Sequence, residues 1–380
     1  MPRPLLRQLA RPLPQILQKK PMYIKPVYPI KIILLWTRRY IYFFLLLSMF
    51  LVFLYDIVGL KWLYLPWLPI GLIGTSLAFI TGFKNNACYE RLWEARKIYG
   101  GIVNTSRLLA TMLNDFVTNE FVKTKRTDAE FFKLKKVIIM RHVAWMTSLR
   151  YALRTKKPWE TNVAFKPDKE QMETIKLKEH KHFLEEGLHA YLEEDEKEFV
   201  LSMTNKPAAC LNLQSKNFKE LKLEGLIDDL RHIQFINIIG ELFTLQGKVE
   251  RIKNFPYPRQ FATLNLFFVW VFMILLPFGL MHEFDGIGNY LARDESLNFI
   301  NRFIVENFVW MTVPTSIIIS WVFTLMERVG DESENPFEGT RNDVPISTIS
   351  RAIEIDIREI IGDDKMEIPH PHPNNGDSEM

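Results

Sequence analysis

Long apolar stretches alternate with highly charged ones along this chain of 380 residues. A membrane-spanning helix needs about 20 mostly apolar residues, and four stretches approach or reach that length. The predicted spans are Ile41–Tyr55 with Ile32–Trp36 ahead of it, Trp62–Phe83, Phe261–Met281 and Phe303–Met326. Proline lies inside or near three of them, which membrane helices tolerate when neighbouring groups satisfy the freed backbone. The charged segment 84–258 is too polar to lie in lipid.

The second predicted span continues into a charged segment without turn residues between them. The apolar run ends within two residues of Phe83, and apolar residues then recur with a period of about 3.6 over Tyr89–Phe116. We therefore predict one helix that crosses the membrane and continues into water. A helix of this kind is suited to line a passage from the membrane to the cytoplasm.

Helical periodicity also predicts the fold of the remaining polar sequence. The expected helices are Phe131–Arg154, Lys169–Glu198, Leu221–Lys253 and the amphipathic Ile346–Ile361. No clear strand signal is present. We therefore predict an all-α membrane protein with four transmembrane helices per subunit and a large helical cytoplasmic domain.

Six parts follow one another in the predicted organisation. They are a basic N-terminal arm (1–31), spans one and two (32–83), a cytoplasmic helical domain (84–258), spans three and four (259–326), a cytoplasmic post-membrane segment (327–362) and a disordered tail (363–380).

Charge sets the predicted orientation. Residues 1–40 hold nine Lys or Arg and no Asp or Glu. Under the positive-inside rule the N-terminus, the long middle and the C-terminus are cytoplasmic, which makes a multi-pass protein of the cell (inner) membrane. A transit peptide is the alternative for the Arg-rich start, whereas a cleaved signal peptide is disfavoured because some thirty residues precede the apolar run. The net charge of +4 is explained by the arm and requires no nucleic-acid partner.

Motifs of enzymes and metal sites are missing from the sequence. Its two cysteines show no zinc spacing, and there is no phosphate loop, nucleophile elbow or HExxH. A loose cluster of His180, His182 and His189 is better explained by a solvated helix face than by a metal site. We predict neither enzymatic activity nor a cofactor.

Four blocks of sequence, in order along the chain, resemble the prokaryotic branch of the bestrophin family. The block after the second span reads Gly82-Phe83-Lys84-Asn85-Asn86-Ala87 and then Tyr89-Glu90-Arg91-Leu92-Trp93-Glu94-Ala95-Arg96-Lys97. The other blocks are Arg141–Trp145 with Leu149-Arg150, Glu250–Pro258, and Asn335–Thr340 with Asn342–Ile346. The resemblance covers roughly residues 25–362. It implies a homopentameric ion channel in a lipid membrane, with permeant ions and further copies of the chain as its partners.

The resemblance places a narrow neck of the pore on Thr75, Phe79 and Phe83. Their spacing of four puts them along one face of a helix. Rings of five phenylalanines would form a hydrophobic constriction, which gates by dewetting. The family signature beside it is Gly82, Asn85 and Asn86. The plainer interpretation is that both phenylalanines pack between helices. Thr75 is more polar than the neck that the family leads us to expect.

A second constriction is implied in the cytoplasmic part. Counting back from the block at Pro256 places it near Ile227 and Asp228. Ile227 would form an apolar ring, whereas a ring of Asp228 carboxylates would favour cations.

An acidic run after the fourth span, with Asp331, Glu332 and Glu334, lies where animal bestrophins carry a calcium site. Calcium takes about six to eight oxygen ligands, and other residues interrupt the carboxylates here. We interpret the run as a solvated linker, with calcium binding as the alternative.

The sign of the permeant ion is the least determined feature. The neck carries no charge, and the positive edges of aromatic rings favour anions, so we predict anion (chloride) conduction. A monovalent cation channel of the same fold is the first alternative. A membrane-anchored sensor or a carrier is the second, and it is disfavoured because the chain shows no paired catalytic residues, no internal repeat and almost no charge within its spans.

Overall fold

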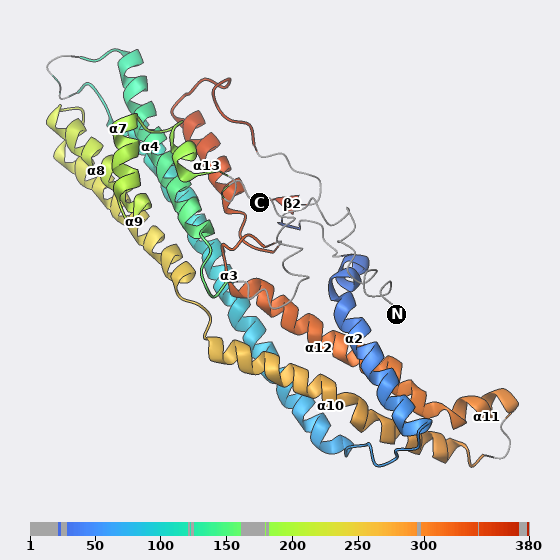
Figure 1. The fold of residues 1–380 in the computed structure, drawn as a ribbon. Coiled ribbons are helices and arrows are strands. Elements are labelled where there is room, and N and C mark those ends of the chain that lie inside the picture. Colours follow the sequence, from blue (N-terminus) through green and yellow to red (C-terminus); the bar gives the residue numbers. More distant parts are fainter. Residues whose placement is uncertain are drawn as a thin grey trace, which may run out of the picture. The chain divides into compact units, whose positions relative to one another are not determined.

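The computed structural model describes residues 22–23, 29–120, 122, 125–160, 179, 182–294, 298–340, 342–371 and 378–379. Within these residues the regular structure is helical, apart from a two-residue antiparallel pair of β1 (Met22–Tyr23) and β2 (Ser378–Glu379). The predicted all-α fold is confirmed (Figure 1). Nearly all of the basic N-terminal arm lies outside the described residues.

The chain divides into two compact units, which are described separately. The first, here called the span unit, comprises residues 27–90 and 257–334. The second, the polar unit, comprises residues 1–26, 91–256 and 335–380. The boundaries between the units after residues 90 and 256 lie near the ends of the predicted parts at 83 and 258. The last one falls after Glu334 rather than Met326, because the fourth helix continues beyond its apolar part.

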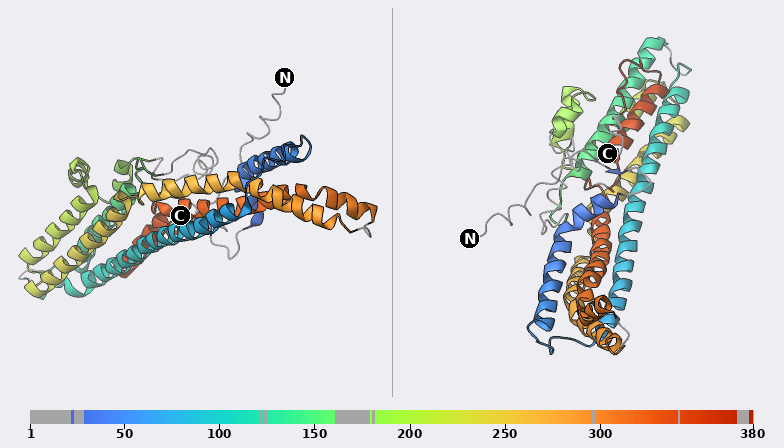
Figure 2. Two further views of the ribbon diagram at one scale, coloured as in Figure 1. Left: turned by 90° about the horizontal axis from the view of Figure 1, so that it is seen from below. Right: turned by 90° about the vertical axis from the view of Figure 1, so that its right-hand side faces the viewer.

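The span unit is built from long apolar helices. Its elements are α2 (Ile30–Asp56), the first part of α3 (Trp67–Phe116), α10 (Arg259–Leu291), α11 (Phe299–Glu306), η3 (Phe308–Met311) and α12 (Thr312–Glu334). Helix α12 packs against both α2 and α10, and these three helices run side by side in Figure 2. The α2, α3 and α10 helices and the stretch Phe308–Glu334 are long and apolar enough to cross a membrane, which agrees with the predicted number of spans. The second begins at Trp67 rather than Trp62, and the fourth at Phe308 rather than Phe303, which belongs to the separate helix α11.

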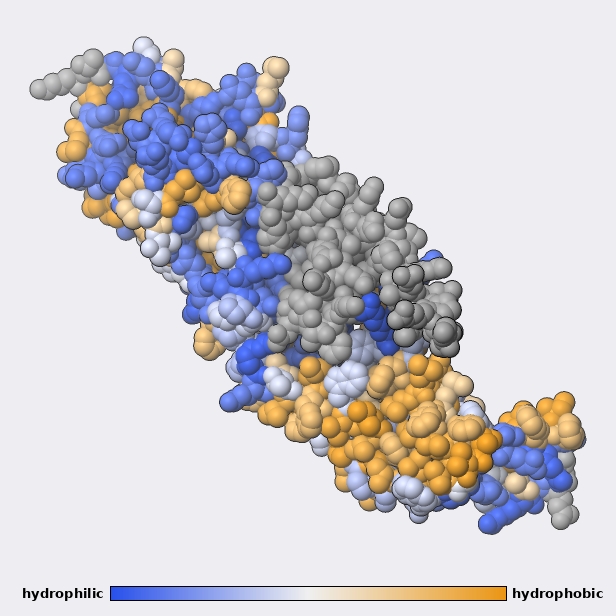
Figure 3. Space-filling model, in the orientation of Figure 1, coloured by the Kyte–Doolittle hydropathy of each residue, from blue (hydrophilic) through white to orange (hydrophobic). Residues whose placement is uncertain are grey.

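Apolar side chains cover the outside of the span unit. Figure 3 shows them gathered over this part of the surface, and they include Leu46, Phe50, Phe261 and Phe267, all largely exposed. Exposing so large an apolar surface to water is energetically unfavourable, whereas contact with lipid is favourable. The protein is therefore an integral membrane protein.

The polar unit is a bundle of helices. Its elements are the rest of α3, α4 (Asp128–Arg154), α6 (Leu184–Leu188), α7 (Glu194–Ser202), α8 (Lys206–Leu223), α9 (Asp229–Asn254) and α13 (Ile346–Ile360). Helix α4 is central, because it packs against α8, α9 and α13. A capping box starts it: the Thr127 hydroxyl accepts a hydrogen bond from the Glu130 backbone, and the Glu130 carboxylate accepts one from Thr127.

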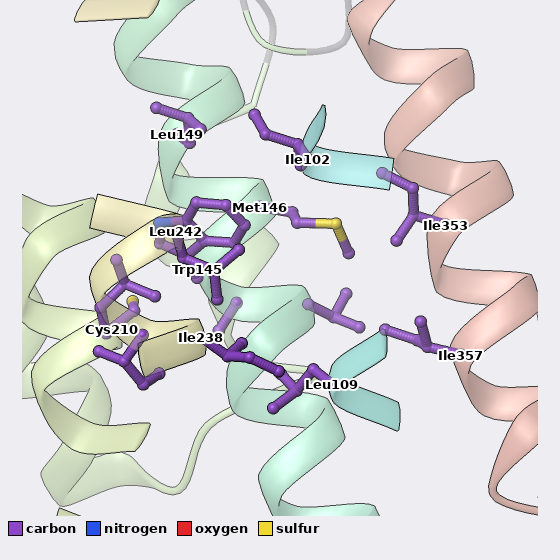
Figure 4. Close-up of a cluster of buried hydrophobic side chains, with 14 of the residues drawn as sticks. Ile102, Leu109, Trp145, Met146, Leu149, Cys210, Ile238, Leu242, Ile353 and Ile357 are labelled. Atoms are coloured by element: carbon purple, nitrogen blue, oxygen red, sulfur yellow. The ribbon is translucent and has the colours of Figure 1, made fainter. Parts of the chain in front are cut away.

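Trp145 of α4 lies at the centre of the polar unit's core. Around it Figure 4 shows Leu109 of α3, Leu242 of α9 and Ile357 of α13. The indole is fully buried, and its N–H donates a hydrogen bond of 2.9 Å to the Gln246 side chain. A buried polar group without a partner costs stability, so this bond lets a large aromatic ring fill the core without penalty.

His142 of α4 is buried beside Trp145. Its Nε2 lies 2.8 Å from the Ser106 hydroxyl and its Nδ1 lies 3.4 Å from the Gln214 side chain. Burial lowers the pKa of the ring to about 4, because the charged form would lose its hydration. The ring is therefore neutral at pH 7 and acts as a packed polar link between three helices.

The expectation of a single helix over Leu221–Lys253 is wrong. Helix α8, which we did not expect as a separate element, ends at Leu223, and Gly225 then takes a left-handed backbone conformation with φ +76°. The Asp228 carboxylate accepts a hydrogen bond of 2.7 Å from the Arg231 backbone and so caps the N-terminus of α9. Glycine readily adopts positive φ and aspartate favours the N-cap, so two local signals end one helix and start the next.

Two other predicted segments differ in the structure. The helix expected over Lys169–Glu198 is replaced, where it is described, by the short helices α6 and α7, and most of 161–181 lies outside the described residues. The tail expected to be disordered from 363 keeps contacts with α13: the Arg358 side chain donates a hydrogen bond of 2.6 Å to Asp363, and Ile368 is buried. Residues 372–377 and 380 lie outside the described residues.

Acid should destabilise the protein through His142. The pKa of the folded state, about 4, is below the unfolded value of about 6.5, so the stabilising contribution is complete above pH 6.5 and is lost as the pH falls toward 4. A shift of that size corresponds to about 3 kcal/mol. Thermal unfolding of the purified protein at pH 7.5 and pH 5 should therefore show a smaller drop in Tm for His142→Gln than for the wild type.

His182 provides the control for this experiment, because its side chain is more than half exposed. His182→Gln should keep the pH dependence of the wild type. Equal Tm losses in the wild type and His142→Gln would show that the buried ring does not carry the effect.

Candidate functional site

Helix α3 presents two different faces within the span unit. Successive residues are rotated by about 100° around a helix, so positions three and four apart share a face. One face is exposed and is here called the free stripe: Leu68, Leu72, Thr75, Phe79, Phe83, Asn86 and Glu90. The opposite face is buried and includes Ile70, Gly74, Leu77, Thr81, Lys84 and Cys88.

The three predicted neck residues lie together on the free stripe. Phe79 is 66% exposed and Phe83 is 74% exposed, so neither packs between helices of its own chain. The Thr75 hydroxyl donates a hydrogen bond of 2.9 Å to the Gly71 carbonyl one turn earlier. Because this bond satisfies the hydroxyl, Thr75 is less polar toward its surroundings than its residue type suggests.

Small and polar residues hold the opposite face of α3 against α10. A Cβ atom added at Gly74 would lie 2.6 Å from the ring of Phe272, so glycine permits this close approach. Two turns later, the Thr81 hydroxyl donates a hydrogen bond of 3.1 Å to the Asn265 side chain of α10. These contacts fix which face of α3 is left free.

Lys84 connects α3 to α12 at the end of the apolar stretch. Its Nζ lies 2.6 Å from the Glu327 carboxylate and 2.8 Å from the Asp331 carboxylate. The side chains of Lys84 and Glu327 are only 2% and 4% exposed. The Asn265 amide donates to the other oxygen of Glu327, so the buried carboxylate is satisfied on both sides.

The family signature after the second span has a structural explanation. The Asn85 side chain donates a hydrogen bond of 2.8 Å to the Met326 carbonyl of α12, and Gly330 leaves no room for a Cβ beside it. Asn86 lies on the free stripe, where its amide donates a hydrogen bond of 2.9 Å to the Glu90 carboxylate. Gly82 is exposed with open space around it.

Sequence reasoning missed the partners of this signature. Thr81, Asn265 and Glu327 are polar residues in or at the end of the apolar spans, and we did not single them out. Polar residues at such positions are rare and need partners, which was the signal available in the sequence.

The interpretation of the acidic run as a solvated linker is wrong. Asp331, Glu332 and Glu334 belong to the last turns of α12, which ends at Glu334. Asp331 pairs with Lys84, and the buried Glu334 pairs with Arg259 of α10. Across the described residues no group of three acidic, histidine or cysteine side chains is gathered so that it could hold a metal ion. Calcium at this run would have to displace two cations.

The structure contradicts the assignment of the second constriction to Ile227. Ile227 is 2% exposed and belongs to the core of the polar unit, where it cannot face a pore. Asp228 caps α9. The exposed apolar residues at the start of α9 are Leu230, 73% exposed, and Ile233.

The other recognised blocks lie at joints of the polar unit. The Arg91 guanidinium donates to the carbonyls of Ile252 and Phe255, just before the prolines that end the third block. The Asp343 carboxylate accepts hydrogen bonds from three backbone N–H groups between residues 337 and 344 and pairs with Arg154 at 2.9 Å. These bonds hold Phe337 in a left-handed conformation with φ +72°.

Glu338 lies buried in the same turn. Burial and the nearby carboxylates of Glu160 and Asp343 raise its pKa to about 8. Lys253 of α9 pairs with Glu160. The turn after α12 is thus held by buried, mostly paired charges, and it contains one carboxyl group that is largely neutral at pH 7.

Known proteins resemble this chain in sequence over most of its length. The family model described as Bacterial/Fungal Bestrophin protein matches residues 28–290 and 302–359. A protein of Ralstonia nicotianae named "voltage-dependent anion channel-forming protein" is 26% identical over 328 residues, which is 84% of this chain and 88% of its own. A protein of the same description from Escherichia coli K12 is 26% identical over 305 residues, 79% of this chain and 78% of its own.

Solved structures show the same fold. The crystal structure of a bacterial bestrophin homologue from Klebsiella pneumoniae superposes with a TM-score of 0.65 at 21% identity, covering 85% of this chain and 98% of that one. Because the family model matches most of the chain, and the sequence blocks and the fold agree with it, the chain belongs to the bacterial and fungal bestrophin family.

Proposed function

We propose that this protein is an anion channel whose pore neck is lined by the free stripe of α3 from five copies of the chain. The observation that carries the proposal is the free stripe itself. Phe79 and Phe83 point away from their own subunit, while the opposite face of the same helix is anchored to α10 and α12. If several copies assembled around one axis, their free stripes would face one another across it.

Exposed apolar residues of the polar unit support assembly. Leu108 of α3 and Leu230, Ile233 and Phe243 of α9 are exposed, and α9 is not among the described helices that are apolar enough to cross a membrane. Contact with further copies would remove these side chains from water. On α9, Gly240 and Gly247 have open space around them and are exposed, which would let another helix approach closely.

A neck of phenylalanine rings would control conduction by determining whether the passage is filled with water. Between Leu68 and Phe83 the free stripe carries no charged residue. An ion in such a passage keeps few of its hydration waters, and a narrow apolar passage empties readily. Small changes in the position of the rings would therefore switch the passage between a wet state and a dry one.

Two arguments favour anions. The relatives from Ralstonia nicotianae and Escherichia coli carry names that describe anion channels. The edges of phenylalanine rings carry partial positive charge, so rings of Phe79 and Phe83 with their edges toward the axis would attract anions. Chloride is the ion we propose.

One observation favours cations instead. Glu90 continues the free stripe two turns beyond Phe83, and Asn86 holds its carboxylate in place. Five such carboxylates below the neck would attract cations. A cation channel of the same fold is therefore the second candidate.

The reversal potential of the purified protein in a planar bilayer under a potassium chloride gradient distinguishes the candidates. We expect it to lie near the chloride equilibrium potential. Glu90→Gln should leave its sign unchanged.

A reversal potential near the potassium equilibrium potential, which Glu90→Gln shifts away from that value, would establish the cation channel. Absence of current from protein shown to be inserted would contradict both and favour a sensor or a carrier.

We further propose that the second constriction is formed by Leu230 rather than Ile227. Leu230 is the most exposed apolar residue at the start of α9, and it lies three residues from the predicted position. A ring of five leucines would form a single apolar aperture in the cytoplasmic part of the pore.

Substitutions at the two proposed constrictions should change the conductance. A substitution at the buried Ile227 should change the stability instead. Phe83→Ala and Leu230→Ala should each raise the open-channel conductance, because each removes apolar atoms from a narrow passage. Ile227→Ala should leave conductance unchanged and lower Tm, since the loss of a buried isoleucine typically costs about 2–5 kcal/mol. Single-channel recording and thermal unfolding measure the two effects.

Opposite behaviour would contradict the assignment. If Ile227→Ala changed conductance without loss of stability while Leu230→Ala did not change it, the aperture would lie at the position first predicted.

We propose that all four long helices cross the cell (inner) membrane and that both termini are cytoplasmic. The basic residues Lys31, Arg38 and Arg39 lie near the start of α2. At its other end, Tyr55 donates a hydrogen bond of 3.0 Å to Asp285, and Trp310 donates one of 2.9 Å to Asp56. The excess of positive charge at the first end supports a cytoplasmic position for that end.

Labelling with a membrane-impermeant maleimide tests this topology. Both native cysteines, Cys88 and Cys210, are buried, so the background should be low. In intact cells Asn289→Cys, at the outer end of α10, should react, and Lys219→Cys on α8 should react only after lysis. The reverse pattern would show that the orientation is inverted.

A further inference from the structure

We propose that Lys84 is a positioning residue of the pore neck: its ion pairs with α12 set the rotation of α3 and so the direction in which Phe83 points. The proposal rests on the proposed function, because it assumes that Phe83 lines the pore. It adds the element that holds the phenylalanine there.

The geometry links the two side chains directly. Lys84 follows Phe83 in the sequence, so the two side chains leave the helix about 100° apart, with no flexible segment between them. Lys84 is 2% exposed and bound to α12, whereas Phe83 is 74% exposed. A rotation of α3 that moved Phe83 away from its present direction would have to pull the ammonium group away from its carboxylates.

The remaining contacts of α12 oppose the same rotation. Asn85 holds the Met326 carbonyl at 2.8 Å, and Gly330 lies so close to Asn85 that no side chain fits between them. On the other side of Lys84, Thr81 is held by Asn265, which also donates to Glu327. Residues 326–331 of α12, about two turns, thus form one joint around the lysine together with Thr81 and Asn85 of α3.

Stability alone does not explain this joint. Burying an ion pair removes both ions from water, and apolar residues of similar volume often replace such pairs without loss of stability. What a buried lysine between two carboxylates provides is a single favourable geometry, because any other arrangement leaves a charge unpaired. Such a requirement suits a helix whose rotation sets the width of a neck.

Removal of the lysine should loosen the direction of Phe83. Glu327 and Asp331 would then face each other without a cation, and the end of α12 would be repelled from its neighbours. Phe83 would be free to leave the axis, so the constriction would widen. The effect on conduction should be of the same kind as truncation of Phe83, and smaller.

Single-channel recording of the full-length protein tests the proposal with a double-mutant design. Lys84→Met keeps most of the methylene packing and removes the charge, and it should raise the open-channel conductance toward the value of Phe83→Ala. In the Phe83→Ala background the same substitution should change nothing, since no ring is left to position. Lys84→Arg, which can keep both ion pairs, should retain a conductance near that of the wild type.

Lys61 offers a matched control. It also bridges two carboxylates, Asp56 at 3.9 Å and Asp285 at 3.7 Å, but it lies half exposed at the opposite end of α2 and α10 from the Lys84 joint. Lys61→Met should leave conductance unchanged. A loss of general stability would affect both lysine variants, whereas a loss of positioning affects Lys84→Met alone.

Each result has a separate meaning. If Phe83→Ala leaves conductance as in the wild type, the proposed neck is wrong. If Phe83→Ala acts and Lys84→Met does not, or if Lys84→Met acts equally in both backgrounds, the positioning role is wrong. Should Lys84→Met fail to fold, Asp331→Asn replaces it, because this carboxylate is partly exposed; the absence of a conductance change there would overturn the proposal.

Discussion

Helix α3 has to be held firmly on one side and left free on the other, and the span unit is arranged to satisfy that requirement. Gly74 admits the ring of Phe272, Thr81 bonds to Asn265, and Lys84 pairs with Glu327 and Asp331. All of these contacts fall on one face of the helix. The other face keeps two phenylalanines exposed, which is unfavourable for a single chain in water and useful for a surface shared with lipid, an ion path or further copies.

Buried charge marks the places where this protein needs a defined geometry. The ion pairs of Lys84 with α12 lie at the end of the apolar stretch, and a second set in the polar unit, with Arg154, Asp343 and Lys253, holds the turn after α12. In both places almost every charged group has a partner, as the cost of unpaired buried charge requires. Apolar packing around Trp145 supplies the stability of the polar unit, and the charged joints supply the positions of its connecting segments.

Patterns along the chain predict the four long apolar helices and the unbroken continuation of α3 beyond Phe83, because these depend on local periodicity. The choice of Thr75, Phe79 and Phe83 as an exposed line rests on the resemblance to the bestrophin family, since their spacing alone is equally compatible with packing between helices. Features that depend on tertiary contacts were not predictable in this way. The break at Gly225 and the cap at Asp228 are local signals, but the apolar periodicity of Leu221–Lys253 runs across them and so predicts a single helix. Ile227 was assigned by counting, and counting cannot show that a side chain turns into the core. The acidic run was interpreted as a linker because its partners, Lys84 and Arg259, lie far away in the sequence.

In the proposed function, the free stripe of α3 faces an ion path formed by several copies of the chain. A density map of the purified protein in lipid nanodiscs would test this arrangement. We expect five copies around one axis, with Phe79 and Phe83 pointing toward it and Lys84 buried against α12. A map in which these phenylalanines face lipid, or in which the protein is a single copy, would contradict it.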